Sequence, residues 1–276
     1  MTWKTLGAVS PDALSEARLQ LHWAAQLLSA PGVSLLPAKE DYSHTNLGWD
    51  FNLGVLTGRG AGTDTLRAAL VFEGLELAVL DGERERSSMR LAGHTLEQAL
   101  SWLGEEVAGD GSALALPSHE MPSSAVGDGA PFSDAGTDAR SELAAWFANA
   151  FALIRDTVSG DPAASPVRSW PHHFDVASLI TLDAGADAEE ARSIGVGFSP
   201  ADGSYAQPYF YVTPWPYPDA VALPALSAGA HWHRDGWTGA VLTAESLVAL
   251  APEKQERGAR QALDEAVAAC RGLLGA

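Results

Sequence analysis

Leu66-Arg-Ala-Ala-Leu-Val-Phe-Glu-Gly-Leu-Glu-Leu-Ala-Val-Leu80 is the stretch that decides the fold of this chain. Two short apolar runs, 66–72 and 75–80, meet at Glu73-Gly74, a pair of residues typical of turns. Runs of this length and composition, separated by a turn, predict a β-hairpin. The first part of the chain is therefore expected to contain an antiparallel sheet.

The segments around this hairpin extend the prediction. Apolar residues alternate with others over residues 49–55, which predicts a further strand. A helix is expected on each side, because apolar residues recur there at helical spacing. The first begins at Ser10-Pro11 and ends at Pro31-Gly32. The second begins at Thr95, with Gln98 three residues later as in a capping box.

The second part of the chain repeats this order. A helix is expected over 138–158, and a last helix opens at Pro252. Short β-type runs lie between them, at 174–182, 193–198, 207–213 and on either side of Asp235-Gly236. The sequence therefore predicts an α+β fold of two similar halves, each helix, antiparallel strands and helix, and leaves open whether they arose by duplication.

Domain boundaries follow from composition. Residues 109–136 are rich in Gly, Ser, Pro and Asp and show little periodicity, so they are predicted to form a connecting loop. The N-terminal α+β half is then expected to span 1–108 and the C-terminal half 137–276. Arg84 to Arg90, with glutamates interleaved, is predicted to be a solvated turn.

The overall composition is that of a globular protein. Hydrophobic residues make up 46% of the 276 residues and charged residues 19%. No apolar run of 18 residues and no apolar signal segment are present, so a soluble, cytoplasmic protein is expected. Cys270 is the only cysteine, which excludes an intramolecular disulfide and a thiolate zinc finger. Its place in an amphipathic helix predicts a packing role.

The net charge restricts the partners. The chain carries a formal charge of −18, and nucleic acids and anionic lipid surfaces are bound through basic patches. No nucleic acid and no membrane are therefore expected as partners. A small-molecule ligand is the expected partner, and the oligomeric state is left open.

Two stretches gather residues suited to a binding site. Trp170-Pro-His-His-Phe-Asp175 and His231-Trp-His-Arg-Asp-Gly-Trp237 hold four of the eight histidines and three of the nine tryptophans. In a strand His231 and His233 point to the same side, and His173 and Asp175 do so if their segment is extended. This pattern predicts a site for a divalent metal such as zinc, with these four residues as ligands. The alternative is packed imidazoles that bond to the backbone.

Further candidates lie outside these stretches. Leu116-Pro-Ser-His-Glu-Met-Pro122 places His119 and Glu120 between prolines, within the predicted loop. Glu120 is the candidate general base for a metal-bound water, and His119 the candidate proton carrier. The alternative for Glu120 is a solvated loop carboxylate. His44 is expected to line the same cleft from the first half.

Aromatic residues supply a second group of candidates. In Pro208-Tyr-Phe-Tyr-Val-Thr-Pro-Trp215 the alternation puts Tyr209, Tyr211 and Thr213 on one face of a strand. The hydroxyl-tipped rings of the two tyrosines are expected to stack on a sugar, a base or another flat ligand, together with Trp215, Trp232 and Trp237. The alternative is a sheet face that is covered by helices.

Three stretches resemble a bacterial family of unknown function, the domain-of-unknown-function group DUF5996. They are 170–177, 207–219 and 239–246; the likeness covers mainly 165–250 and, more faintly, 44–51. The chain shares that family's Phe174-Asp175 and its Pro208-x-Phe-Tyr211, whereas His173 and the His-x-His at 231–233 depart from its pattern. The resemblance implies no activity.

Two functions are consistent with these features. The first is a metal-dependent enzyme of the hydrolase type, built on the histidine pairs. The second is a non-catalytic protein that binds a small molecule or a peptide on its aromatic surface. Other signatures of catalysis, such as Gly-x-Ser-x-Gly or His-Glu-x-x-His, are absent from the sequence.

Overall fold

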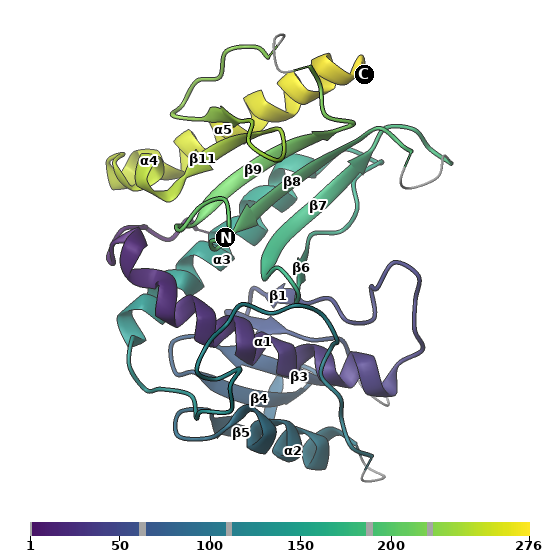
Figure 1. Ribbon diagram of the computed structural model, residues 1–276, viewed down its shortest axis with the longest axis vertical. Coiled ribbons are helices and arrows are strands. Elements are labelled where there is room, and N and C mark those ends of the chain that lie inside the picture. The colour runs from purple at the N-terminus through teal and green to yellow at the C-terminus, as the bar shows by residue number, and fades with distance from the viewer. Residues whose placement is uncertain (1, 61–64, 109–111, 186–189, 220–222) are drawn as a thin grey trace. The chain divides into compact units, whose positions relative to one another are not determined.

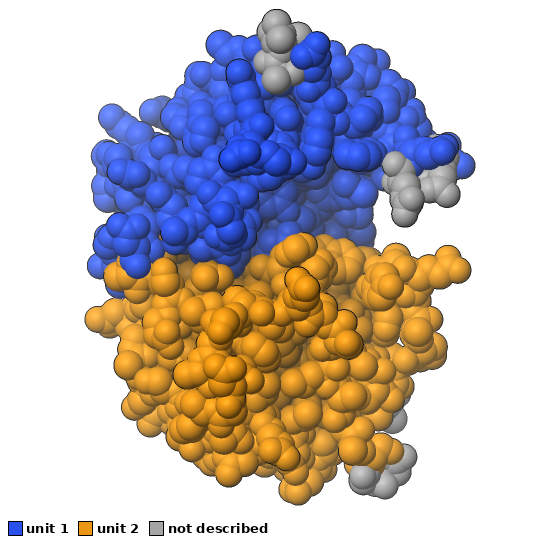
Figure 2. Space-filling view, viewed as in Figure 1, with its two compact units in different colours: residues 1–12, 149–167, 175–276 blue, residues 13–148, 168–174 orange. Residues whose placement is uncertain are grey.

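The computed structural model describes residues 2–60, 65–108, 112–185, 190–219 and 223–276 (Figure 1). It divides into two compact units (Figure 2). Unit 1 comprises residues 1–12, 149–167 and 175–276, and unit 2 comprises residues 13–148 and 168–174. The prediction of an α+β fold with two similar halves is confirmed. Residues 109–111 of the predicted connecting loop lie outside the described part.

Helices and strands occupy most of both units. The helices are η1 (Pro11–Leu14, a 3-10 turn), α1 (Ser15–Leu35), α2 (Leu96–Val107), α3 (Thr137–Val158), α4 (Ala244–Val248) and α5 (Pro252–Leu274). The strands are β1 (Gly48–Asp50), β2 (Val55–Thr57), β3 (Leu66–Val71), β4 (Glu76–Asp81), β5 (Arg84–Arg90), β6 (Arg168–Trp170), β7 (Asp175–Thr181), β8 (Ser193–Ser199), β9 (Tyr209–Trp215), β10 (His231–His233) and β11 (Gly239–Thr243). α3 ends in unit 1 but begins in unit 2.

Unit 2 is built on the antiparallel sheet β1-β2-β3-β4-β5. The predicted hairpin is confirmed as β3 and β4, paired from Leu66 with Asp81 to Val71 with Glu76. α1 and α2 pack on this sheet, and α2 has the predicted capping box between Thr95 and Gln98. The core of the unit gathers the aromatic rings of Trp49, Phe72, Phe147 and Phe174.

Unit 1 contains strands in the order β10-β11-β9-β8-β7, all antiparallel. α5 packs along β9, β8 and β11 (Figure 1). Phe210 and Val212 of β9 are buried, and Cys270 of α5 is buried with its Sγ 4.0 Å from the Val212 carbonyl oxygen. The alternation predicted for β9 therefore holds, and Cys270 has the expected packing position.

Three local predictions are wrong. The run 49–55 forms two strands, β1 and β2, because Asp50 Oδ1 accepts hydrogen bonds from the backbone of Asn52 and Leu53 at 3.0 and 3.1 Å and turns the chain. α1 continues through Pro31-Gly32 to Leu35. The run 84–90 forms the edge strand β5, whose side chains are mostly exposed, because β4 offers an unpaired edge.

The units differ from the predicted boundaries at 108 and 137. The first residues belong to unit 1, where Lys4 N bonds to Asn149 Oδ1 at 2.9 Å and Leu6 N bonds to Gln255 Oε1 at 2.9 Å. Residues 168–174 belong to unit 2. Each unit therefore combines segments that are distant in the sequence, and hydrogen bonds such as those of Lys4 and Leu6 join them.

None of the helices in the described part of the chain combines the length and the apolar character that crossing a bilayer requires.

Candidate functional site

The segment Arg168–Phe174 is held on unit 2 by helix α1. The Pro171 carbonyl accepts hydrogen bonds from His22 Nε2 at 2.9 Å and from Gln26 Nε2 at 2.7 Å. On its other side Ser169 exchanges two backbone hydrogen bonds with Leu47, of 2.8 and 2.9 Å. These contacts fix the backbone between Trp170 and His172.

The same segment ends in a turn. Phe174 N donates to the Trp170 carbonyl at 2.7 Å, and Phe174 adopts a φ of 57°. Its ring is fully buried, 4.7 Å from Phe147 and stacked 5.2 Å from His22. The extended conformation predicted for this segment is therefore wrong, because burial of Phe174 requires the chain to turn.

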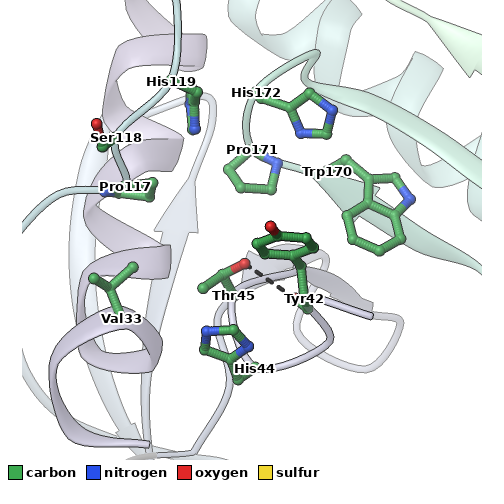
Figure 3. A pocket seen from close by; sticks show the side chains of 10 residues that line it. All are labelled: Val33, Tyr42, His44, Thr45, Pro117, Ser118, His119, Trp170, Pro171 and His172. Atoms are coloured by element: carbon green, nitrogen blue, oxygen red, sulfur yellow. Dashed lines mark hydrogen bonds between the residues drawn. The ribbon is translucent and has the colours of Figure 1, made fainter. Parts of the chain in front are cut away.

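Loop residues 112–136 lie along α1 and form a second wall. Ser34 Oγ accepts from Ala115 N at 2.8 Å, and Trp23 Nε1 donates to the Pro122 carbonyl at 3.1 Å. Farther along, Ser133 N donates to Gln20 Oε1 at 2.8 Å. These anchors along α1 place Pro117, Ser118 and His119 beside the Trp170 segment (Figure 3).

Residues 42–45 form the third wall, next to the end of α1. Ser29 Oγ donates to the Thr45 carbonyl at 2.8 Å. A Cβ on Gly32 would lie 2.0 Å from the His44 carbonyl oxygen, so only glycine allows this close approach. Lys39 N donates to His44 Nδ1 at 3.2 Å, which leaves the hydrogen of the neutral ring on Nε2.

These walls enclose a pocket of about 470 Å³ in unit 2 (Figure 3). Its volume lies within the range of about 300–1,000 Å³ that is typical of small-molecule sites. The lining combines three imidazoles, two aromatic rings and small polar and apolar groups: Val33, Tyr42, His44, Thr45, Pro117, Ser118, His119, Trp170, Pro171 and His172.

The histidines of this region form a cluster. The rings of His119 and His172 lie 5.8 Å apart, and those of His172 and His173 lie 4.1 Å apart. Desolvation lowers the pKa of His172 to about 4, with smaller effects from the charges of His173 and His119, although part of the residue is exposed. Desolvation and His173 lower the pKa of His119 as well. At neutral pH these two rings are uncharged.

Two buried ring nitrogens in the cluster have no hydrogen-bond partner within the described part of the chain. One is Nε2 of His119, in the wall of the pocket, and the other is Nδ1 of His22. His22 is buried behind Pro171, and desolvation lowers its pKa to about 4 against the effect of the hydrogen bond to Pro171. His119 thus lines the pocket, while its Nε2 is a buried polar atom without a partner among the described residues.

The second histidine stretch lies in unit 1. His231 Nε2 and His233 Nδ1 lie 3.0 and 3.1 Å from Tyr205 Oη, so both imidazoles of β10 point to the same side. His233 Nε2 lies 2.7 Å from the Asp235 carbonyl, which only accepts. His233 Nε2 therefore carries a hydrogen, and Nδ1 is the nitrogen that faces Tyr205.

The aromatic face of β9 lies beside this group. Tyr211 Oη donates to Asp175 Oδ2 at 2.8 Å, and its ring lies over Gly197, where a Cβ would be 2.2 Å from Tyr211 Cζ. Tyr209 Oη donates to Asp202. Burial, followed by the nearby carboxylates, raises the pKa of Tyr209 and Tyr211. Both hydroxyl groups stay protonated and serve as donors to carboxylates.

The tryptophans predicted to bind a ligand occupy different surroundings. Trp237 stacks on His233 at 4.3 Å and donates to Ser204 Oγ at 3.1 Å. Trp232 donates to the Pro224 carbonyl at 2.7 Å. Trp215 is 44% exposed. None of them lines the pocket in unit 2.

The predicted site residues therefore separate into two groups. His44 and His119 line the pocket of unit 2, and His173 belongs to the same unit. Asp175, His231 and His233 belong to unit 1. Glu120 is exposed and does not line the pocket, so its role as a base stays a prediction. In the described ranges no group of three or more His, Cys, Asp or Glu side chains is arranged to hold a metal ion.

Sequence reasoning missed four residues of these sites. Tyr42, Trp170 and His172 line the pocket, and Tyr205 bridges the histidines of unit 1. The density of histidine and tryptophan at 170–173, with His44 and His119, was the signal for this region, whereas Tyr42 and Tyr205 stand outside any motif.

Comparisons with known proteins add no relative. Neither protein-family models, nor curated proteins, nor solved structures gave a match to the chain. The resemblance to DUF5996 thus stays a prediction.

Proposed function

We propose that the protein binds a small, flat, hydrogen-bonding molecule in the pocket of unit 2. The observation that carries the proposal is a pocket of about 470 Å³ whose lining combines two aromatic rings with three imidazoles. Its volume and its mixed apolar and polar lining are typical of small-molecule sites.

The lining also indicates the character of the ligand. Trp170 and Tyr42 offer aromatic faces on which a planar ring can stack. His119 and His172 are neutral at pH 7, so each ring has one donor and one acceptor nitrogen. Such a wall suits a heterocycle with donors and acceptors at its edge, such as a nucleobase or a flat cofactor fragment.

Ligand-observed NMR with a panel of purines, pyrimidines, nicotinamides and flavins tests this proposal. Binding should weaken at least tenfold in Trp170→Ala and in His119→Ala. Trp215→Ala is the matched control, since Trp215 is an exposed tryptophan of unit 1. A panel without any binder, or binders that Trp170→Ala leaves unchanged, would contradict the proposal. Unfolding midpoints of the variants separate lost binding from lost folding.

A second candidate function, metal binding in unit 1, has its own observation. The two imidazole nitrogens of β10 lie 3.0 and 3.1 Å from Tyr205 Oη, so both nitrogens face one point. The remaining nitrogen of His233 bonds to a carbonyl, as metal-bound imidazoles commonly do. His231 and His233 are thus the proposed protein ligands.

Zinc titration of protein purified without a histidine tag tests this second candidate. The wild type should bind one Zn²⁺ and the double variant His231→Ala/His233→Ala none. His172→Ala/His173→Ala, a matched pair in the other stretch, should bind Zn²⁺ as the wild type does. Equal binding by all three proteins would exclude the site. A bound zinc would polarise a water for hydrolysis, which is the enzyme function expected from the sequence.

A further inference from the structure

A second, smaller pocket of unit 2 adjoins the first. It has a volume of about 280 Å³, and its lining includes Lys39, Ser43, His44 and Arg59. His44 lines both pockets. The two pockets are therefore neighbours that share His44 in their linings.

In the described part of the chain, Arg59 bonds to an amide oxygen and not to a carboxylate. Its Nε donates to Asn46 Oδ1 at 2.7 Å, and its Nη2 contacts the same oxygen. Asn46 is fully buried and neutral. No ion pair of Arg59 exists among the described residues, which makes this half-buried guanidinium unusual, because buried charges are normally paired.

A second guanidinium lies near the first. Desolvation lowers the pKa of Arg59, the charge of Arg168 lowers it further, and Asp41 offsets part of this effect. Arg168 pairs with Asp41 at 3.6 Å, but the Asp41 side chain is 63% exposed, and Arg168 Nε is buried without a partner in the described chain. Lys39 and Glu40 are both exposed. The pocket thus keeps a net positive charge in a chain of net charge −18.

We propose that this smaller pocket binds the anionic group, a phosphate or a carboxylate, of the ligand whose flat part occupies the larger pocket. The inference rests on the proposed function. The Arg59 N–H groups that do not bond to Asn46 can donate to the oxygens of such a group, and its negative charge offsets the repulsion between Arg59 and Arg168. The ligand class is therefore a planar molecule with one acidic substituent.

Matched probes separate the two pockets: phenyl phosphate against phenol, AMP against adenosine, benzoate, and inorganic phosphate alone. In NMR titrations at pH 7.5 each phosphorylated probe should bind at least tenfold more tightly than its neutral partner. Arg59→Gln should abolish this difference, while Arg59→Lys, which keeps the charge but loses the fork, should retain part of it. Arg67→Gln, an arginine of β3 that pairs with Asp50, is the control.

The outcomes distinguish the two proposals. If neutral and phosphorylated probes bind with equal affinity, and Trp170→Ala weakens both, the anion pocket is overturned and the flat-ligand pocket stays in place. If inorganic phosphate binds and its binding requires Arg59, but no aromatic probe binds, the result would support the anion pocket and contradict the proposed function. Benzoate that binds as tightly as phenyl phosphate identifies a carboxylate as an equal occupant. If Arg59→Gln unfolds, a phosphate affinity in Arg59→Lys equal to that of the wild type overturns the proposal.

Discussion

Replacing His22 by glutamine should flatten the dependence of stability on pH. His22 is 3% exposed, and its pKa falls from 6.5 to about 4 on folding, chiefly through desolvation. Between these two values the unfolded chain binds more protons than the folded chain. Stability from this residue is therefore present above about pH 6.5 and is lost as the pH falls toward 4.

The magnitude follows from the two pKa values. Protonation of the unfolded state costs about 2 kcal/mol of stability at pH 5, and only about 0.2 kcal/mol at pH 7. In the variant this loss disappears, whereas the lost hydrogen bond to Pro171 and the lost stacking on Phe174 weaken the protein at both pH values. The difference between the two pH values thus isolates the titration.

Urea unfolding of both proteins at pH 7 and pH 5, followed by tryptophan fluorescence, measures this difference. The wild type should lose about 2 kcal/mol more than His22→Gln over this interval. His94→Gln, a histidine of unit 2 outside the cluster, should behave as the wild type. Equal losses in the wild type and His22→Gln would refute the argument that His22 is buried in its neutral form.

Three further outcomes are expected. Gly197→Ala should destabilise the protein by about 1–3 kcal/mol, because the new Cβ would collide with the Tyr211 ring. Gly203→Ala is the control and should leave the unfolding midpoint unchanged, because its Cβ meets open space. The Cys270 thiol, whose pKa burial raises to about 12, should resist a thiol reagent at pH 8 until urea unfolds the chain. Thr95→Ala should cost about 1 kcal/mol in unfolding free energy, through loss of the α2 cap.

The sequence predicted the features that depend on short-range patterns. The hairpin of β3 and β4, the capping box of Thr95 and the two faces of β9 follow from neighbours a few residues apart. The turn at Pro171–Phe174 does not, because the positive φ of Phe174 is stabilised by Phe147 and His22, which are distant in the chain. Burial of His22 escaped prediction for the same reason.

The pocket could be predicted only in part. Its three walls come from residues 42–45, 117–119 and 170–172, and α1 brings them together through Ser29, Ser34 and Gln26. The sequence does not show which backbone groups such polar residues of a helix will bond to. A sequence pattern can therefore name the histidines but not the helix that assembles them.

Dense histidines in a sequence do not imply one site in space. The stretch 170–175 divides at Phe174, so that His172 and His173 join His119 in unit 2, whereas His231 and His233 join Tyr205 in unit 1. We propose an organic ligand for the rings beside Trp170 and a metal ion for the two nitrogens of β10 that face Tyr205. Because different units hold the two groups, variants in one stretch should leave binding at the other unchanged. Loss of zinc binding in His172→Ala/His173→Ala would show that this separation is wrong.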